Sequence, residues 1–144
     1  MPAFWDASGV VPLCVSEART TLARRFLRSC GPPIVVWWAT AAEVHSGIAR
    51  LMREGRLDGQ TEEAIRTRLT LLRRSWREML PSDGVRDLAE QLLYQHPLRT
   101  ADAFQLAAAL QWCRERPRGR VFVCFDIRLA DAAGQQGFEV LRAA

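Results

Sequence analysis

The stretch RVFVCFDIRLADAAGQQGFEVL, residues 120–141, has the pattern of one complete strand–helix–strand unit. Its first part, RVFVCF, is apolar on both faces, which is typical of a strand buried inside a parallel sheet. Asp126 then leads into a short alanine-containing helix, and FEVL has the pattern of a closing strand. This order predicts two parallel strands joined by a helical crossover.

The rest of the chain continues the alternation. Apolar runs of strand length lie at residues 3–5 and 34–38, and SWREML at 75–80 contains a shorter candidate. A helix can begin after Asp6, with Pro12 interrupting or displacing it. Apolar residues recur at helical spacing in five further segments: residues 17–28, 40–54, 61–74, 85–94 and 100–116. We therefore predict a single α/β domain over residues 1–144, in which a central parallel β-sheet carries helices on both faces.

Composition supports a globular domain with a basic surface. The chain has 144 residues, of which 49% are hydrophobic and 25% charged, and no apolar run is long enough to span a membrane. All 20 basic residues are arginines, and the formal net charge is +4. Guanidinium groups bind phosphates in a bidentate manner, so this composition is compatible with a nucleic-acid partner.

The cysteines and the first residues indicate the compartment. The four cysteines have no C-x-x-C spacing, and the first residues, MPAFWDAS, lack the basic start of a secretion signal. We therefore expect reduced thiols and a cytoplasmic protein.

Four acidic residues stand at or near the starts of predicted helices: Asp6, Glu43, Asp102 and Asp126. Asp102 even lies on the apolar line of its helix, where a carboxylate needs a partner. Strands of a parallel sheet end at one edge, and the following helices begin there, so the four side chains should meet in one cleft. Carboxylates gathered in this way repel one another unless a cation neutralises them.

Each acid also has a purely structural explanation. Asp6 and Asp126 could be N-caps of the helices that follow them. Thr40 and Glu43 have the spacing of a capping box, and Asp102 in a first helical turn is favoured by the helix dipole. The case for a shared cleft rests on all four acids together.

A cluster of carboxylates without His or Cys ligands suits Mg²⁺ or Mn²⁺ rather than zinc. Such ions polarise a phosphate and lower the pKa of a bound water, which then attacks the phosphorus in line. Together with the arginines, the acids therefore point to cleavage of phosphodiester bonds.

Four segments resemble the acidic motifs of PIN domains, in order and over essentially the whole chain: FWDASGVVPL, TAAEVHSGIARL, LRTADAFQLAAAL and VFVCFDIRLADAAGQQGFEVL. The third is the most specific and is similar to the VapC toxins of bacterial VapBC toxin–antitoxin pairs. The resemblance implies a Mg²⁺- or Mn²⁺-dependent endoribonuclease, inhibited by a cognate VapB-like antitoxin and often a homodimer. It assigns the catalytic and metal-binding roles to Asp6, Glu43, Asp102 and Asp126.

One residue departs from the family pattern near the fourth acid. Many members have Thr or Ser two residues before that acid, whereas this chain has Cys124. A thiol is a poor partner for a hard cation or its waters. Asp131, five residues after Asp126, is an alternative fourth acid, and its other explanation is a solvated helix face.

Three further residues are candidates for binding substrate. Ser8 could bond to a metal ligand or water, or simply to the start of its helix. Arg99 could hold a substrate phosphate or an inhibitor's carboxylate, or form an ion pair with the acids. Trp38, beside the predicted strand end, could line the cleft or pack at its rim.

Two rival functions remain compatible with the sequence. One is a PIN nuclease of RNA processing outside toxin–antitoxin systems. The other is an RNA-binding or scaffold module that keeps the fold and has lost cleavage.

Overall fold

The structure is a computed structural model that describes residues 1–57 and 59–143. Five short strands, all parallel, form one sheet in the order β3-β2-β1-β4-β5. Their bounds are Ala3–Trp5 (β1), Ile34–Trp37 (β2), Arg77–Met79 (β3), Val121–Val123 (β4) and Glu139–Leu141 (β5). The predicted α/β fold with a central parallel sheet is therefore confirmed.

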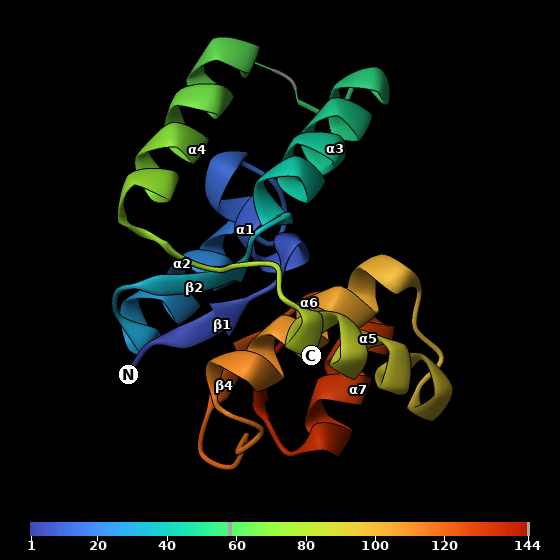
Figure 1. Cartoon of the computed structure of the whole chain (residues 1–144). Coiled ribbons are helices and arrows are strands. Elements are labelled where there is room, and N and C mark those ends of the chain that lie inside the picture. Colours follow the sequence, from blue (N-terminus) through green and yellow to red (C-terminus); the bar gives the residue numbers. More distant parts are fainter. Residues whose placement is uncertain (58, 144) are drawn as a thin grey trace.

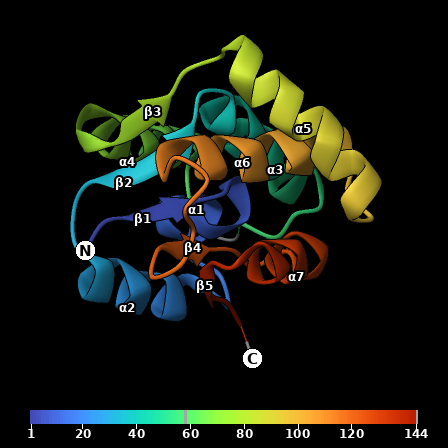
Figure 2. The same cartoon turned by 60° about the horizontal axis from the view of Figure 1, so that its bottom comes forward.

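Helices cover both faces of this sheet, as expected. They are α1 (Ala7–Cys14), α2 (Thr20–Cys30), α3 (Thr40–Arg53), α4 (Glu62–Ser75), α5 (Asp83–Gln95), α6 (Thr100–Trp112) and α7 (Ile127–Gln136). Phe4 and Phe122 pack into one core with α5, α6 and α7, whereas Trp5 and Val123 pack into a second core with α1 to α4. The alternation follows from the two-residue period of a strand. Figure 1 shows α3 and α4 on one side of the sheet and α5, α6 and α7 on the other, and Figure 2 shows the layers from a second direction.

Three helices differ from the sequence prediction by more than one or two terminal residues or at an expected break. Helix α1 continues through Pro12 to Cys14, because burial of this turn against the sheet offsets the hydrogen bond that proline cannot donate. Helix α2 begins at Thr20 rather than at residue 17, since the Thr20 hydroxyl donates to the Val15 carbonyl at 2.7 Å and closes a turn ahead of the helix.

Helix α6 ends at Trp112, four residues earlier than predicted. Arg114 and Glu115 adopt φ angles of 54° and 57°, in the left-handed region, which stops the helix. No helix in the described part of the chain is long and apolar enough to cross a membrane.

The strand order places a crevice beside β1. The chain first builds β2 and β3 on one side of β1 and then returns to place β4 and β5 on the other. Ligands of open α/β sheets bind outside the carboxyl ends of the strands at such a reversal. The residues that follow β1, β2 and β4 therefore occupy the position where a functional site is expected.

Candidate functional site

The four predicted acids come from adjacent elements at this crevice. Asp6 directly follows β1, Asp126 follows β4, and Glu43 lies in the first turn of α3, which follows β2. Asp102 lies in the first turn of α6, a helix that packs against β2. The sequence prediction that these four residues approach one edge is thus consistent with the arrangement of the elements.

Asp6 is almost completely buried and is fixed by Ser8. Its carboxylate accepts hydrogen bonds from the Ser8 hydroxyl at 2.7 Å and the Ser8 amide at 3.3 Å, so it is the N-cap of α1. The Ser8 hydroxyl also accepts the Phe125 amide at 2.9 Å, which ties this corner to the end of β4. Burial raises the pKa of Asp6 from 3.8 to about 7; the Ser8 hydrogen bonds lower it, and the charge of Glu43 adds to the rise.

Glu43 is half-buried and is held by a residue from a distant part of the chain. The Gln105 side-chain amide donates to the Glu43 carboxylate at 2.7 Å and to the Thr40 hydroxyl at 3.0 Å. Burial raises the pKa of Glu43, the Gln105 hydrogen bond lowers it, and the nearby charge of Asp102 raises it. The capping box does not form: the N-cap of α3 is Ala39, and the Thr40 hydroxyl instead faces Gln105.

Asp102 and Asp126 line an open pocket of about 530 Å³. Asp126 caps α7 by accepting the Leu129 amide at 2.9 Å. The pKa of Asp102 is raised by burial and by the charge of Asp126, whereas Arg99 and Arg128 lower it. The same pocket is lined by three arginines: Arg19, Arg99 and Arg128.

The acids therefore form an electrostatically connected series. The charge of Glu43 raises the pKa of Asp6, that of Asp102 raises the pKa of Glu43, and that of Asp126 raises the pKa of Asp102. Capping explains part of the positions of Asp6 and Asp126, but it does not explain why three of the four carboxylates have a raised pKa. The protein groups around them leave their negative charge incompletely compensated.

This donor set has the chemistry of a site for a hard divalent cation. It consists of carboxylate oxygens, which suit Mg²⁺ or Mn²⁺, and a cation would offset the burial, and the smaller mutual repulsion, that raise the pKa values. As the side chains stand, no three Asp, Glu, His or Cys residues of the described chain are grouped closely enough to hold an ion. Binding would require the carboxylates to draw together around it.

The structure assigns separate roles to Cys124 and Asp131. The Cys124 thiol is buried, donates to the Asp126 carbonyl at 3.3 Å and lies 3.8 Å from the Ser8 hydroxyl. Burial raises the pKa of this thiol, so it stays protonated and supports the backbone. Asp131 forms an ion pair with Arg142 at 2.7 Å and does not line the pocket that contains Asp126. Asp126 is therefore the better placed fourth acid.

Arg99 is exposed, precedes α6 as its N-cap residue and lines the pocket beside Asp102. Among the described residues, no ion pair within 4 Å joins it to an acid. Ser8, in contrast, is engaged with Asp6 and Phe125.

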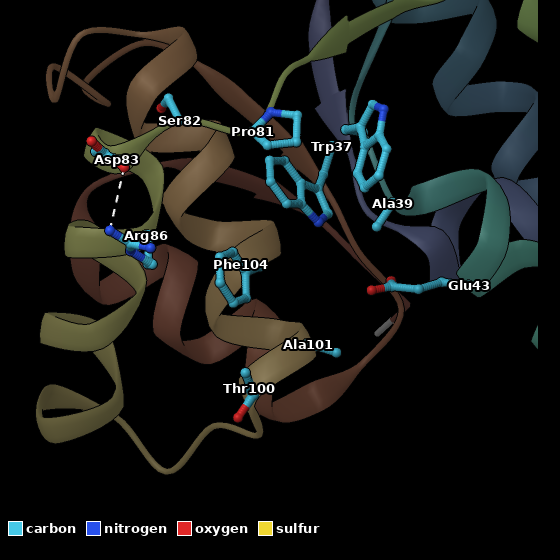
Figure 3. Close-up of a pocket in the computed structure, with 11 residues that line it drawn as sticks. Trp37, Ala39, Glu43, Pro81, Ser82, Asp83, Arg86, Thr100, Ala101 and Phe104 are labelled. Carbon is cyan, nitrogen blue, oxygen red and sulfur yellow. Dashed lines mark hydrogen bonds and ion pairs between the residues drawn. The ribbon is translucent and has the colours of Figure 1, made fainter.

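Two features of this site were not predicted from the sequence. Gln105 is buried among the apolar residues of α6, and the question raised for Asp102 applies to it too: a polar side chain on a buried face needs a partner. The second feature is an aromatic pocket of about 670 Å³ beside Glu43, formed by residues of β2, α6 and the segment before α5. Figure 3 shows the Glu43 carboxylate pointing into this space, toward Ala101 and Phe104.

Comparisons with known proteins identify the fold. No protein-family model and no curated protein matches the chain. Among solved structures, it is similar to a chain of a toxin–antitoxin complex from Klebsiella pneumoniae, with a TM-score of 0.60 and 20% identity over 88% of each chain. It is also similar to a chain of VapBC2 from Rickettsia felis, in a crystal structure bound to a DNA fragment from their promoter, with a TM-score of 0.67 and 10% identity over 100% of each chain. At these identities the likeness establishes the fold alone, and this is the PIN-like α/β fold that the sequence predicted.

Proposed function

We propose that the protein is the toxin of a VapBC-type toxin–antitoxin system and acts as a Mg²⁺- or Mn²⁺-dependent endoribonuclease. The observation that carries this proposal is the series of four carboxylates at the strand reversal, three of which have a raised pKa. The fold shared with two toxin–antitoxin complexes supports it. Cytoplasmic location and a homodimeric state belong to the same proposal.

In this mechanism Asp6, Glu43, Asp102 and Asp126 would hold one or two ions, which would supply charge stabilisation and an activated water. Ser8 and Gln105 orient the first two carboxylates through hydrogen bonds. Arg19, Arg99 and Arg128 line the pocket of Asp102 and Asp126 and bind the RNA phosphates on either side of the cut. In this mechanism water attacks the phosphorus, so no protein side chain is needed as the nucleophile.

The decisive experiment compares two acids of α6 and α7. Protein purified free of any partner is incubated with single-stranded and structured RNAs in Mg²⁺, Mn²⁺ or EDTA. We expect the wild type and Asp131→Asn to cut RNA with metal, and Asp102→Asn to lose cutting by more than about 100-fold, because even residues that only orient metal ligands cost 10- to 100-fold. Asp131→Asn is the matched control, since Asp131 pairs with Arg142 outside the acid pocket.

Calorimetric titration with Mg²⁺ and Mn²⁺ separates the rival functions. A folded wild type that takes up no metal and cuts no RNA, but still binds it, is a binding module without cleavage. Expression in a bacterial host separates the toxin from an RNA-processing nuclease: the toxin arrests growth, Asp102→Asn does not, and a cognate VapB-like antitoxin restores growth.

A further inference from the structure

The aromatic pocket beside Glu43 has features that the acid cleft does not explain. Its walls include Trp37 and Trp38 at the end of β2, Pro81 before α5 and Phe104 on α6. Three of these four side chains are aromatic, although the pocket opens to solvent next to a cluster of carboxylates. An aromatic surface exposed beside a charged cleft suggests a ligand with both flat apolar and charged parts.

The pocket adjoins the acid cleft. Glu43 lines the aromatic pocket, and Ala101 lines both this pocket and the pocket of Asp102 and Asp126. In Figure 3 Phe104 lies between the side chains of Arg86 and Glu43, with Thr100 and Ala101 at the start of α6 next to it. A group seated in the aromatic pocket is therefore a direct neighbour of whatever the acids hold.

The two tryptophans at the end of β2 differ in exposure: Trp37 is buried, whereas Trp38 is exposed. The Trp38 amide donates to the Met79 carbonyl at 3.0 Å, which fixes its backbone beside β3, yet 54% of the residue is exposed. Trp37 stacks on Phe104 with ring centroids 5.6 Å apart and an interplanar angle of 14°. This stack forms one wall of the pocket, and Trp38 contributes an accessible surface next to it.

The polar rim suits the edge of a base. Ser82 and Thr100 offer hydroxyl groups, and Arg86 offers a guanidinium that is paired with Asp83 at 3.3 Å. Both partners of this ion pair are largely exposed, so the pair itself holds Arg86 weakly. The guanidinium can turn to a hydrogen-bond acceptor on a ligand without a large cost.

We propose that this pocket, the Trp38 pocket, binds an unpaired base of the RNA chain, adjacent to the phosphodiester that the acids cut. The inference rests on the proposed nuclease function and adds the position and chemical class of a substrate contact. Phosphates lie among Arg19, Arg99 and Arg128, while the neighbouring base stacks on aromatic rings, as in other single-strand binders. The base must be unpaired, since bases inside an A-form helix are not accessible to such a pocket.

The test uses RNA with one base removed at a time. Binding to a single-stranded RNA is measured in an Asp102→Asn background, so that the strand stays intact, and repeated with an abasic nucleotide at each position around the cut site. Trp38→Ala should weaken binding of the intact RNA by roughly 5- to 150-fold, the range of base–aromatic stacking. Trp38→Phe, which keeps a ring, should retain most of the affinity.

One abasic position should weaken binding to the parent protein by a similar factor and have little further effect on Trp38→Ala, because both changes remove the same contact. Tyr94→Ala is the matched control, since Tyr94 is 95% exposed on α5 and does not line the pocket. We expect it to bind every RNA like the parent.

Three outcomes overturn the proposal. If Trp38→Ala binds intact RNA as tightly as the parent while the wild type still cuts RNA, the pocket has another role and the nuclease function stands. A Trp38→Ala variant that weakens only a complex with a protein partner assigns the pocket to that partner. If the wild type neither binds nor cuts RNA, the proposed function fails together with the pocket.

Discussion

Asp6 and Asp102 are both carboxylates of the candidate site, but Asp6 is buried under the sheet edge and Asp102 faces an open pocket lined by arginines. The inner corner, Asp6 and Glu43, is held by hydrogen bonds from Ser8 and Gln105. The outer corner, Asp102 and Asp126, lies among guanidinium groups, two of which lower the pKa of Asp102.

The difference indicates a division of labour within one site. Burial, nearly complete for Asp6 and partial for Glu43, makes the inner corner unfavourable for negative charge, so it gains most from a cation. The outer corner is balanced by arginines and remains accessible to a large polyanion. Metal binding should therefore depend most on the inner corner, and RNA binding on the outer corner. Three predictions test this comparison.

The largest expected effect is the pH dependence of stability, which Asp6 dominates. A carboxyl whose pKa is raised in the folded state binds more protons there than in the unfolded chain, so stability is highest below the unfolded pKa and falls as pH rises through the folded one. The rise in the pKa of Asp6 from 3.8 to about 7 corresponds to a decrease of about 4 kcal/mol in the free energy of unfolding. This decrease develops as the pH rises from the lower value and is complete only above pH 7. Urea unfolding in EDTA from pH 4 to pH 8 measures this pH dependence of the free energy of unfolding.

Asp6→Asn should remove most of this fall, and Mg²⁺ should reduce it in the wild type, since the ion favours the ionised carboxylate. At pH 8 in EDTA the variant should therefore be the more stable protein, although it has lost metal binding. A wild-type profile that stays flat between pH 4 and pH 8 contradicts the buried, uncompensated Asp6.

Several of these features were predictable from the sequence, because they depend on local patterns. The strand–helix–strand pattern of residues 120–141 becomes β4, α7 and β5, with the acid at position 126 at the start of the helix. Apolar runs and helical spacing also located β1, β2 and the helices to within a few residues. Local rules failed at Pro12, because burial of its turn against the sheet outweighs the tendency of proline to interrupt a helix.

Gln105 and the Trp38 pocket could not be predicted in the same way. Gln105 bonds to Glu43, 62 positions away, and Trp37 stacks on Phe104 from another element. Such contacts depend on how α6 lies against the end of β2, which no single segment encodes. A polar residue at a buried helix position gives a sequence signal for a partner, but it does not identify that partner.

The second prediction concerns Gln105→Leu, which breaks the inner corner without removing a carboxylate. Glu43 loses the donor that fixes it, so we expect Mg²⁺ affinity and cleavage to fall by about 10- to 100-fold, as for other residues that orient metal ligands. Calorimetric titration gives the affinity, and single-turnover cleavage gives the rate.

Gln111→Leu is the control for this change, because Gln111 lies on the same helix and is exposed. RNA affinity in the absence of metal should be equal in both variants, since Gln105 does not line the arginine pocket. If Gln105→Leu loses RNA binding as well as metal binding, and Gln111→Leu loses neither, the two corners do not have separate roles.

The smallest effect is expected in the outer corner, from Arg99→Ala. If Arg99 binds a phosphate, this change should weaken RNA binding several-fold and to a similar extent for all sequences, and reduce the slope of log affinity against log salt concentration by about one. Arg66→Ala is the control, because Arg66 lies on α4 and pairs with Glu62 at 3.6 Å. If Arg99 instead serves only to balance Asp102, its removal should leave the salt slope unchanged and raise the pKa of Asp102 further, since the guanidinium lowers it now. Titration of Asp102 by NMR alongside the salt series therefore decides whether the arginines of the outer corner face the substrate or the acids.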